Sequence, residues 1–213
     1  MDYINIALAK GRIGKDACNV FKKIGLGDSI DPHSRKLIFK DDKNRISFVY
    51  VKPSDVLTYV QNGVADLGVA GKDIILESDN DVYEIYDLGF GKCKFAIAGM
   101  KDQKNFSKDQ VIRVATKYPK IAKKYFDEKE QKIRLIKLNG SVELAPLVDL
   151  SDVIVDLVET GNTLKANGLE VLEDMFDISA RLICNRISYR FKYDRIINII
   201  ECLKGMEDYD EGY

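Results

Sequence analysis

The sequence of 213 residues is poor in the side chains that most metal sites and disulfide frameworks use. It has one histidine, His33, so a histidine-rich metal site and a histidine-based catalytic triad are disfavoured, and we expect His33 to lie in a surface loop. The cysteines form no CxxC pair, which removes zinc-finger spacing and leaves reduced thiols as the simplest interpretation. They are Cys18, Cys93, Cys184 and Cys202.

The sequence also lacks a strong net charge and a long apolar run. Thirty-three Lys and Arg stand against 34 Asp and Glu, giving a formal net charge of −1. Such a balance predicts no nucleic-acid or membrane partner, so any anion site must be built locally. The N-terminus places its apolar residues before its cations, the reverse of a signal peptide, and no run reaches the length of a membrane span. We therefore expect a cytoplasmic protein.

Strand-like and helix-like segments alternate along the chain, which predicts an α/β fold. The acidic tail, 205–213, is expected to be frayed, and the segment 168–177 to lead into the last strand. The predicted strands are 4–9, 36–39, 45–51, 66–71, 82–88, 94–98, 111–115, 133–138, 153–158 and 178–185. The predicted helices are 14–24, 53–61, a short one from 72, 119–127, a short one around 143–144, and 193–203.

The order of these segments predicts two lobes. Residues 1–91 and 179–213 would form lobe I, because the strand 178–185 returns to it, and 92–178 would form lobe II. A ligand cleft is expected where the carboxyl ends of strands from both lobes face each other.

The stretch Asp152–Leu164 predicts a phosphate-binding turn. An apolar strand ends in Glu159-Thr160-Gly161-Asn162-Thr163 and a helical turn follows at Leu164. Backbone N–H groups converge at such a strand–loop–helix junction, and Asp156 and Glu159 suit the hydroxyls of a sugar. A capped turn with solvated acids explains the same pattern, so the loop alone does not decide between these interpretations.

Cations mark a second anion site. Lys10 and Arg12 precede a helix N-terminus, where positive charge is unfavourable unless an anion binds or the turn is simply exposed. Arg35 and Lys52 flank a predicted hairpin and would reach the same end of the sheet. A further strand leads into Asn139-Gly140-Ser141.

Several long motifs occur in one order from Ile6 to about Arg186, and together they resemble the catalytic subunit of the ATP phosphoribosyltransferases. The resemblance implies transfer of the phosphoribosyl group of PRPP (5-phosphoribosyl 1-diphosphate) to N1 of ATP, with Mg²⁺, as the first step of histidine biosynthesis. The motifs are ALAKGR (7–12), SRKLIF (34–39), GVADLGVAGKD (63–73), RVATKYP (113–119), KLNGSVELAPL (137–147), DLVETGNTL (156–164) and ISARLICNR (178–186).

The resemblance also implies a fold and an assembly. The fold would be a two-lobed arrangement like that of type II periplasmic binding proteins. The chain resembles the short form of the family, without a C-terminal regulatory domain. Short-form subunits work as homodimers within a hetero-octamer, with a regulatory subunit resembling histidyl-tRNA synthetase that confers feedback inhibition by histidine.

The motifs carry over a set of site residues. For PRPP, the amides and hydroxyls of the turn would hold the 5′-phosphate, Asp156 or Glu159 would bind ribose hydroxyls or Mg²⁺, and Glu143 would orient the ribose or a Mg²⁺-bound water. The PRPP set is Ser141, Glu143, Asp156, Glu159, Thr160, Gly161, Asn162, Thr163 and Leu164.

The catalytic and ATP sets lie in the first lobe. The cations would hold pyrophosphate and nucleotide phosphates. The family usually has arginine at the position of Lys52, so bidentate phosphate contact there is weakened. The catalytic set is Lys10, Arg12, Arg35 and Lys52, and the ATP set is Gly11, Arg35, Lys52 and Asp73.

Three other functions fit parts of the pattern. A two-lobed small-molecule binding protein shares the fold but would need export. The effector lobe of a transcription regulator would need a helix-turn-helix segment, which the sequence does not offer. Another class of phosphoribosyltransferase shares the acidic residues followed by Thr-Gly-x-Thr, but does not carry ALAKGR or GVADLGVAGKD.

Overall fold

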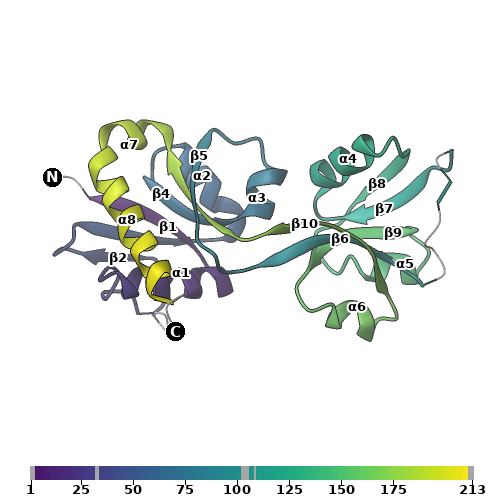
Figure 1. Ribbon diagram of the computed structural model, residues 1–213, viewed down its shortest axis with the longest axis horizontal. Helices are drawn as coiled ribbons and strands as arrows, with labels where there is room; N and C mark the ends of the chain where they lie inside the picture. The colour runs from purple at the N-terminus through teal and green to yellow at the C-terminus, as the bar shows by residue number, and fades with distance from the viewer. Residues whose placement is uncertain (1–2, 32–33, 102–105, 108, 211–213) are drawn as a thin grey trace. The chain divides into compact units, whose positions relative to one another are not determined.

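The computed structural model describes residues 3–31, 34–101, 106–107 and 109–210. His33 lies outside the described residues, so its expected loop position stays a prediction. The chain divides into two compact units (Figure 1): unit 1 is Met1–Gly91 with Ser179–Tyr213, and unit 2 is Lys92–Ile178. The chain passes from one unit to the other after Gly91 and returns after Ile178.

Unit 1 is a mixed sheet covered by helices. Among the described residues its strands follow the order β2-β3-β1-β4-β11-β5, and β1 pairs in parallel with β3 and β4. The carboxyl ends of β3, β1 and β4 therefore lie at one edge of the sheet. The strands are β1 (Ile4–Ala9), β2 (Ile38–Asp41), β3 (Ile46–Val51), β4 (Leu67–Gly71), β5 (Val82–Asp87) and β11 (Ala180–Asn185). The helices are α1 (Arg12–Lys23), η1 (Pro53–Asp55), α2 (Val56–Gln61), α3 (Lys72–Glu77), α7 (Arg186–Phe191) and α8 (Tyr193–Asp210).

Alternation along the strands of unit 1 sends apolar side chains to both faces of the sheet. On β1, Ile4, Ile6 and Leu8 join the core cluster that packs against α1 and α8. Ala7 and Ala9 join the cluster on the α2 side. Two-sided burial explains why these strands read as nearly continuous apolar runs.

Two glycines let helices of unit 1 pack directly on strands. A Cβ on Gly14 would overlap the carbonyl oxygen of Ala9, so only glycine allows α1 to pass so close to the end of β1. A Cβ on Gly68 would lie 2.7 Å from Cγ2 of Val60. Glycine at this position of β4 therefore lets helix α2 pack closely against the strand.

Unit 2 is a smaller mixed sheet with strand order β10-β6-β9-β7-β8 among its described residues. β7 pairs in parallel with both β8 and β9, and β6 pairs antiparallel with β9 and β10. Its strands are β6 (Cys93–Gly99), β7 (Ile112–Thr116), β8 (Ile133–Lys137), β9 (Val153–Val158) and β10 (Glu170–Ile178). Its helices are α4 (Pro119–Glu128), α5 (Leu144–Leu147) and α6 (Asn162–Ala166).

A buried polar network fixes the returning C-terminal segment to unit 1. Asp66, only 4% exposed, accepts hydrogen bonds from the Lys192 ammonium at 2.8 Å and the Ser188 hydroxyl at 2.6 Å. It also accepts the backbone N–H of Asn5 at 2.8 Å. A buried carboxylate is tolerated only when it is paired in this way, so the network ties α7 and α8 to β1 and β4.

Among the corrections that the structure makes to the sequence predictions, three concern residues 170–210. Glu170–Ile178 forms strand β10, because it pairs antiparallel with β6 along its length, although its acidic residues do not read as a strand. Helix α7 was not predicted; the side chain of Asn185 caps it by accepting the N–H groups of Ile187 and Ser188. Helix α8 runs to Asp210, so the tail expected to be frayed from residue 205 is helical to that point.

Candidate active site

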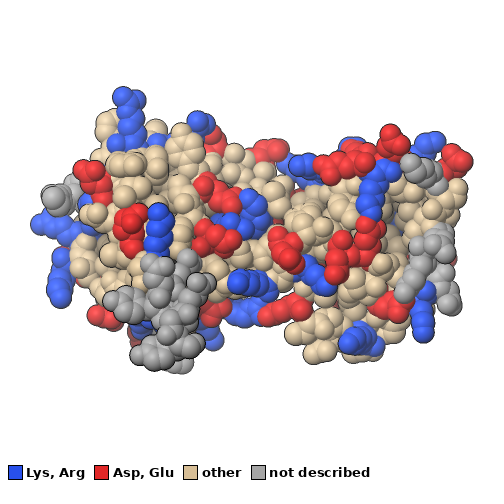
Figure 2. All heavy atoms as spheres, in the orientation of Figure 1, with Lys and Arg blue, Asp and Glu red and all other residues tan. Residues whose placement is uncertain are grey.

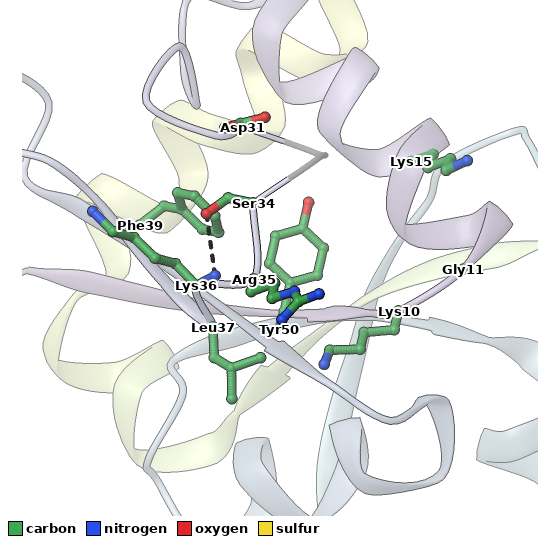
Figure 3. Close-up of a pocket in the computed structure, with 10 residues that line it drawn as sticks. All are labelled: Lys10, Gly11, Lys15, Asp31, Ser34, Arg35, Lys36, Leu37, Phe39 and Tyr50. Carbon is green, nitrogen blue, oxygen red and sulfur yellow. Dashed lines mark hydrogen bonds between the residues drawn. The ribbon is translucent and has the colours of Figure 1, made fainter.

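The edge of unit 1 at the carboxyl end of β1 carries a pocket of about 380 Å³ that we call the cation pocket (Figure 3). Three residues of the predicted catalytic and nucleotide sets line it: Lys10, Gly11 and Arg35. Among the described residues, the lining is Lys10, Gly11, Lys15, Asp31, Ser34, Arg35, Lys36, Leu37, Phe39 and Tyr50.

The basic side chains of the cation pocket do not all point the same way. In Figure 3 the ends of Lys10 and Arg35 lie near one another beside Tyr50, whereas Lys15 and Lys36 point away from them. The Ser34 hydroxyl accepts the N–H of Lys36 at 3.1 Å, which shapes the turn that leads into β2. Lys10 and Arg35 are therefore the pair placed to bind one anion.

Gly11 makes the strand-to-helix turn that presents Lys10. Its φ is 110° and its ψ is −157°, a conformation that side chains disfavour, and helix α1 begins at the next residue, Arg12. This start is two residues earlier than the sequence predicted. The first turn of α1, which is fully described, holds no acidic residue to offset the positive end of the helix dipole. An anion at this turn would meet favourable partial charge.

Arg12, Lys52 and Asp73 were predicted at the same site but do not line the cation pocket. Strand register nevertheless keeps two of them at the same sheet edge. Ala9 pairs with Val51, and the N–H of Lys10 donates to the carbonyl of Val51 at 2.8 Å, so Lys52 follows on the strand beside Lys10. Asp73 follows β4, the neighbour of β1 on its other side. Arg12 does not follow a neighbouring strand but is the first residue of helix α1.

Unit 2 carries a pocket of about 370 Å³ that we call the carboxylate pocket. Glu143, Asp156 and Glu159 supply its acids, and the predicted phosphate turn supplies its rim. Its lining is Ala96, Ala98, Glu143, Ile154, Asp156, Leu157, Val158, Glu159, Thr160, Gly161, Asn162, Thr163 and Leu164.

Small residues on β6 make room for the carboxylate pocket. Asp156 lies within β9 directly opposite Ala96, and it shares a face of the sheet with Ile154 and Val158. Ala96 and Ala98 are both almost fully buried. Because a methyl group fills so little of the space above the sheet, the carboxylate of Asp156 has a cavity beside it.

The turn after β9 has the geometry of an anion grip. Gly161 has φ 72° and ψ 4°, the left-handed conformation that glycine adopts freely, and helix α6 begins at Asn162. The N–H of Asn162 lies 3.4 Å from the Thr160 hydroxyl, a long contact. First-turn N–H groups of a helix have no intrahelical acceptor, so those of Thr163 and Leu164 remain available to an anion.

The segment after β8 contributes Glu143 but not Ser141. Glu143 precedes the short helix α5 rather than lying inside it, and it lines the carboxylate pocket. Ser141 was predicted at the same site, but it is exposed, has a φ of 46° and does not line the pocket. This segment therefore offers one of its two predicted polar residues to the pocket.

Sequence reasoning missed the aromatic part of the cation pocket. Tyr50 and Phe39 lie on β3 and β2 and read from the sequence as ordinary strand residues. The Tyr50 hydroxyl lies 2.5 Å from the Cys18 thiol. Burial and this contact raise the pKa of Tyr50, so its phenol stays protonated and does not act as a base. The available signal was position alone, since Tyr50 stands one residue before the end of β3.

The described residues contain no group of three or more His, Cys, Asp or Glu arranged to hold a metal ion. The acids of the carboxylate pocket are nevertheless the oxygen donors that Mg²⁺ prefers, and Mg²⁺ commonly takes one or two carboxylates together with substrate phosphates. The donor set therefore fits Mg²⁺ only in company with a phosphorylated substrate. Asp156 and Glu159 are the two carboxylates closest in sequence to the phosphate turn.

One face of the molecule is mixed in charge. Figure 2 shows Lys, Arg, Asp and Glu side chains interspersed over the face in view. No described helix is both long enough and apolar enough to span a membrane.

Comparison with known proteins identifies what the chain resembles. A family model described as ATP phosphoribosyltransferase matches residues 52–205. The ATP phosphoribosyltransferase of Clostridioides difficile (strain 630) is 68% identical over 208 residues, covering 98% of this chain and all of the relative. That of Lachnoclostridium phytofermentans is 51% identical, covering 96% and 97% of the two chains.

Two solved structures confirm the fold class. A chain of the ATP phosphoribosyl transferase (HisG:HisZ) complex from Thermotoga maritima has a TM-score of 0.81 and 33% identity, covering 97% of this chain and 99% of that one. The periplasmic aliphatic sulphonate binding protein SsuA from Escherichia coli has a TM-score of 0.60 at 14% identity, covering 95% and 72%, and shows the fold alone. The two-lobed arrangement like that of periplasmic binding proteins is therefore confirmed.

Proposed function

This chain belongs to the ATP phosphoribosyltransferase family, and from that premise we propose how its two pockets divide the reaction. The enzyme transfers the phosphoribosyl group of PRPP to N1 of ATP and releases pyrophosphate, the first step of histidine biosynthesis. The cation pocket and the carboxylate pocket are lined by residues that the sequence motifs nominated, so they are the natural places for the substrates.

The carboxylate pocket binds the ribose and 5′-phosphate of PRPP. The N–H groups and hydroxyls of the Thr160–Thr163 turn hold the phosphate, and Asp156 and Glu159 accept hydrogen bonds from the ribose hydroxyls. Glu143 lines the same pocket from the start of α5 and orients the ribose. The observation that carries the proposal is the meeting of this turn and these acids in one cavity.

The cation pocket binds phosphates of the nucleotide and of the leaving pyrophosphate. Lys10 and Arg35 provide charge at the pocket, and Gly11 keeps the backbone turn open. Lys52 and Asp73 flank Lys10 at the same sheet edge, and Arg12 opens α1 beside it. The guanidinium of Arg35 is the one fork in the pocket that can take two phosphate oxygens at once.

The reaction requires positioning of the two substrates and stabilisation of the charge that develops on pyrophosphate. Attack of N1 at the anomeric carbon expels pyrophosphate through a transition state with oxocarbenium character. Adenine N1 has a lone pair and needs no general base, so the cations act by stabilising the departing negative charge. Mg²⁺, when bound with the substrate phosphates and Asp156 or Glu159, supplies further charge neutralisation.

We also propose a regulatory partner. The Thermotoga maritima relative was solved as a HisG:HisZ complex, and that chain is matched over almost its whole length. The partner of this chain would resemble histidyl-tRNA synthetase and would assemble with catalytic homodimers into a hetero-octamer. Feedback by histidine would then act through the partner, in the cytoplasm.

The test follows phosphoribosyl-ATP by absorbance, with the purified chain, ATP, PRPP and Mg²⁺, alone and with a regulatory subunit. We expect product that requires Mg²⁺ and both substrates. No product under either condition would contradict the proposal and favour a small-molecule binding protein of the same fold.

A further inference from the structure

The cation pocket has an aromatic wall that phosphate binding does not require. Phosphate needs positive charge and N–H donors, yet Tyr50 lines the pocket together with Lys10 and Arg35 (Figure 3). Phe39, which also lines the pocket, packs against this ring. An apolar surface next to an anion grip suits a ligand that joins a flat, apolar group to phosphates.

The ring of Tyr50 is held in a fixed orientation. Phe39 packs against it edge to face, with ring centroids 5.8 Å apart and an interplanar angle of 82°. The hydroxyl is held by Cys18 on α1, and the backbone N–H of Tyr50 donates to the carbonyl of Leu37 at 2.8 Å. A ring fixed from α1 and β2 at once loses little entropy when a ligand packs on it.

The hydroxyl of Tyr50 is not directed at the cations that would hold phosphate. In Figure 3 it points away from Lys10, toward α1. Because its hydroxyl contacts the thiol of Cys18, the side chain presents its ring to the pocket. Tyr50 is therefore suited to recognise shape and apolar surface.

We propose that Tyr50 is a specificity-determining residue: its ring is the wall on which the purine base of the nucleotide packs while Lys10 and Arg35 hold phosphates. The inference rests on the proposed function, since it assigns a nucleotide to the cation pocket. A cavity of about 380 Å³ lies in the range that small-molecule sites occupy. Tyr50 thus distinguishes ATP from a polyphosphate that has no base.

The test compares binding of ATP and of inorganic tripolyphosphate, measured by calorimetry on the full chain. Both probes carry three phosphates, and only ATP carries a base. Tyr50→Leu should weaken ATP binding about tenfold, as loss of one base–aromatic stack does, and leave tripolyphosphate binding unchanged. Tyr50→Phe, which keeps the ring, should restore most of the preference for ATP.

A matched variant separates recognition from packing. Phe48 lies on the same face of β3, is fully buried, and does not line the pocket. Phe48→Leu should lower the melting temperature without changing the ratio of the two affinities. If Tyr50→Leu does not fold, Tyr50→Met, which fills the space without a ring, carries the same comparison.

Equal weakening of both probes by Tyr50→Leu, or no change in either, would overturn the inference. Steady-state kinetics add a second criterion: KM for ATP should rise while KM for PRPP stays constant. Binding is measured without turnover, so an inactive wild-type chain would contradict the proposed function and leave the comparison of probes intact.

Discussion

The cation pocket and the carboxylate pocket have nearly the same volume, about 380 and 370 Å³, and opposite chemistry. The first uses long charged side chains and aromatic rings. The second uses short acids, hydroxyls and backbone N–H groups above a floor of alanine. The contrast matches the two kinds of chemical group in the reaction, because polyphosphate needs charge, whereas a ribose phosphate needs acceptors for its hydroxyls and a shaped backbone.

The two pockets should therefore fail in different ways. The cation pocket depends on the charge of its side chains, such as that of Arg35, which lies in the segment before β2. The carboxylate pocket depends on backbone shape, since its turn is set by Gly161 at a φ of 72°. Charge substitutions should damage the first pocket most, and backbone substitutions the second.

The largest effect is expected from Arg35→Ala. Loss of the guanidinium removes stabilisation of the charge on departing pyrophosphate, and kcat/KM should fall by about 10²–10³-fold. The control is Lys36→Ala, which removes the neighbouring charge that points away from Lys10 in Figure 3 and should cost little. Equal losses in both variants would show that the pocket acts only through its total charge.

A matched pair of glycines tests the carboxylate pocket. Gly161 and Gly168 have the same φ of 72° at the two ends of α6, and a Cβ on either meets no atom closer than 3.9 Å. Alanine at either position should cost about 1–2 kcal/mol in the free energy of unfolding. Only Gly161→Ala, which displaces the turn, should lower kcat/KM for PRPP, by about 100-fold. Similar kinetics for the two variants would remove the turn from the PRPP site.

Asp152, a carboxylate of unit 2 that does not line the carboxylate pocket, should affect stability and not catalysis. Burial alone would raise the pKa of Asp152, but hydrogen bonds from Arg113, at 2.7 Å and 3.1 Å to one oxygen, hold it below its ordinary value. An acid whose pKa is lowered in the folded state stabilises the fold at pH values above its unfolded pKa of about 3.9. It loses that contribution as the pH falls toward its pKa in the folded state.

Asp152→Asn should therefore lower the melting temperature at neutral pH by about 3 °C and flatten its decline below about pH 4. Thermal melts across pH measure this change, and KM for PRPP should stay constant. A large change in KM would mean that the acids of unit 2 do not separate into structural and binding groups.

The smallest effect is expected from Lys52→Arg. This residue lies beside Lys10 at the end of β3, where a cation of either kind supplies charge. The planar fork of arginine should keep kcat/KM or improve it by about twofold. Steady-state kinetics measure the change, and a large loss would show that this position does not contact phosphate.

Much of the fold was predictable because its strands are apolar, short and bounded by glycine or charge. β1 was predicted at its exact bounds, and the hairpin of β2 and β3 was predicted within two residues. The strand β10 was missed because it is an edge strand whose partner β6 supplies the pairing, while its own sequence carries Glu170, Glu173, Asp174 and Asp177. Tertiary pairing decided its structure where local propensity did not.

The site residues that follow strands could be nominated from sequence, and their grouping could not. Lys10 and Arg35 meet in one pocket although 25 positions separate them, because β2 folds back on β3 beside β1. Tyr50, Ala96 and Ala98 gave no signal, since a strand residue next to a cavity has the same pattern as one in a packed core. Pocket shape depends on side-chain volumes across neighbouring strands, which a single strand does not reveal.

The place of β11 between β4 and β5 sets the order in which the chain can complete its structure. During synthesis every residue of unit 2 emerges before β11 does, so the second unit can close its sheet while the first still lacks an inner strand. The first unit must wait with β4 and β5 unjoined until residue 185 is available. Unit 2, which carries the carboxylate pocket, can therefore fold first on the ribosome, and unit 1, which carries the cation pocket, is completed last.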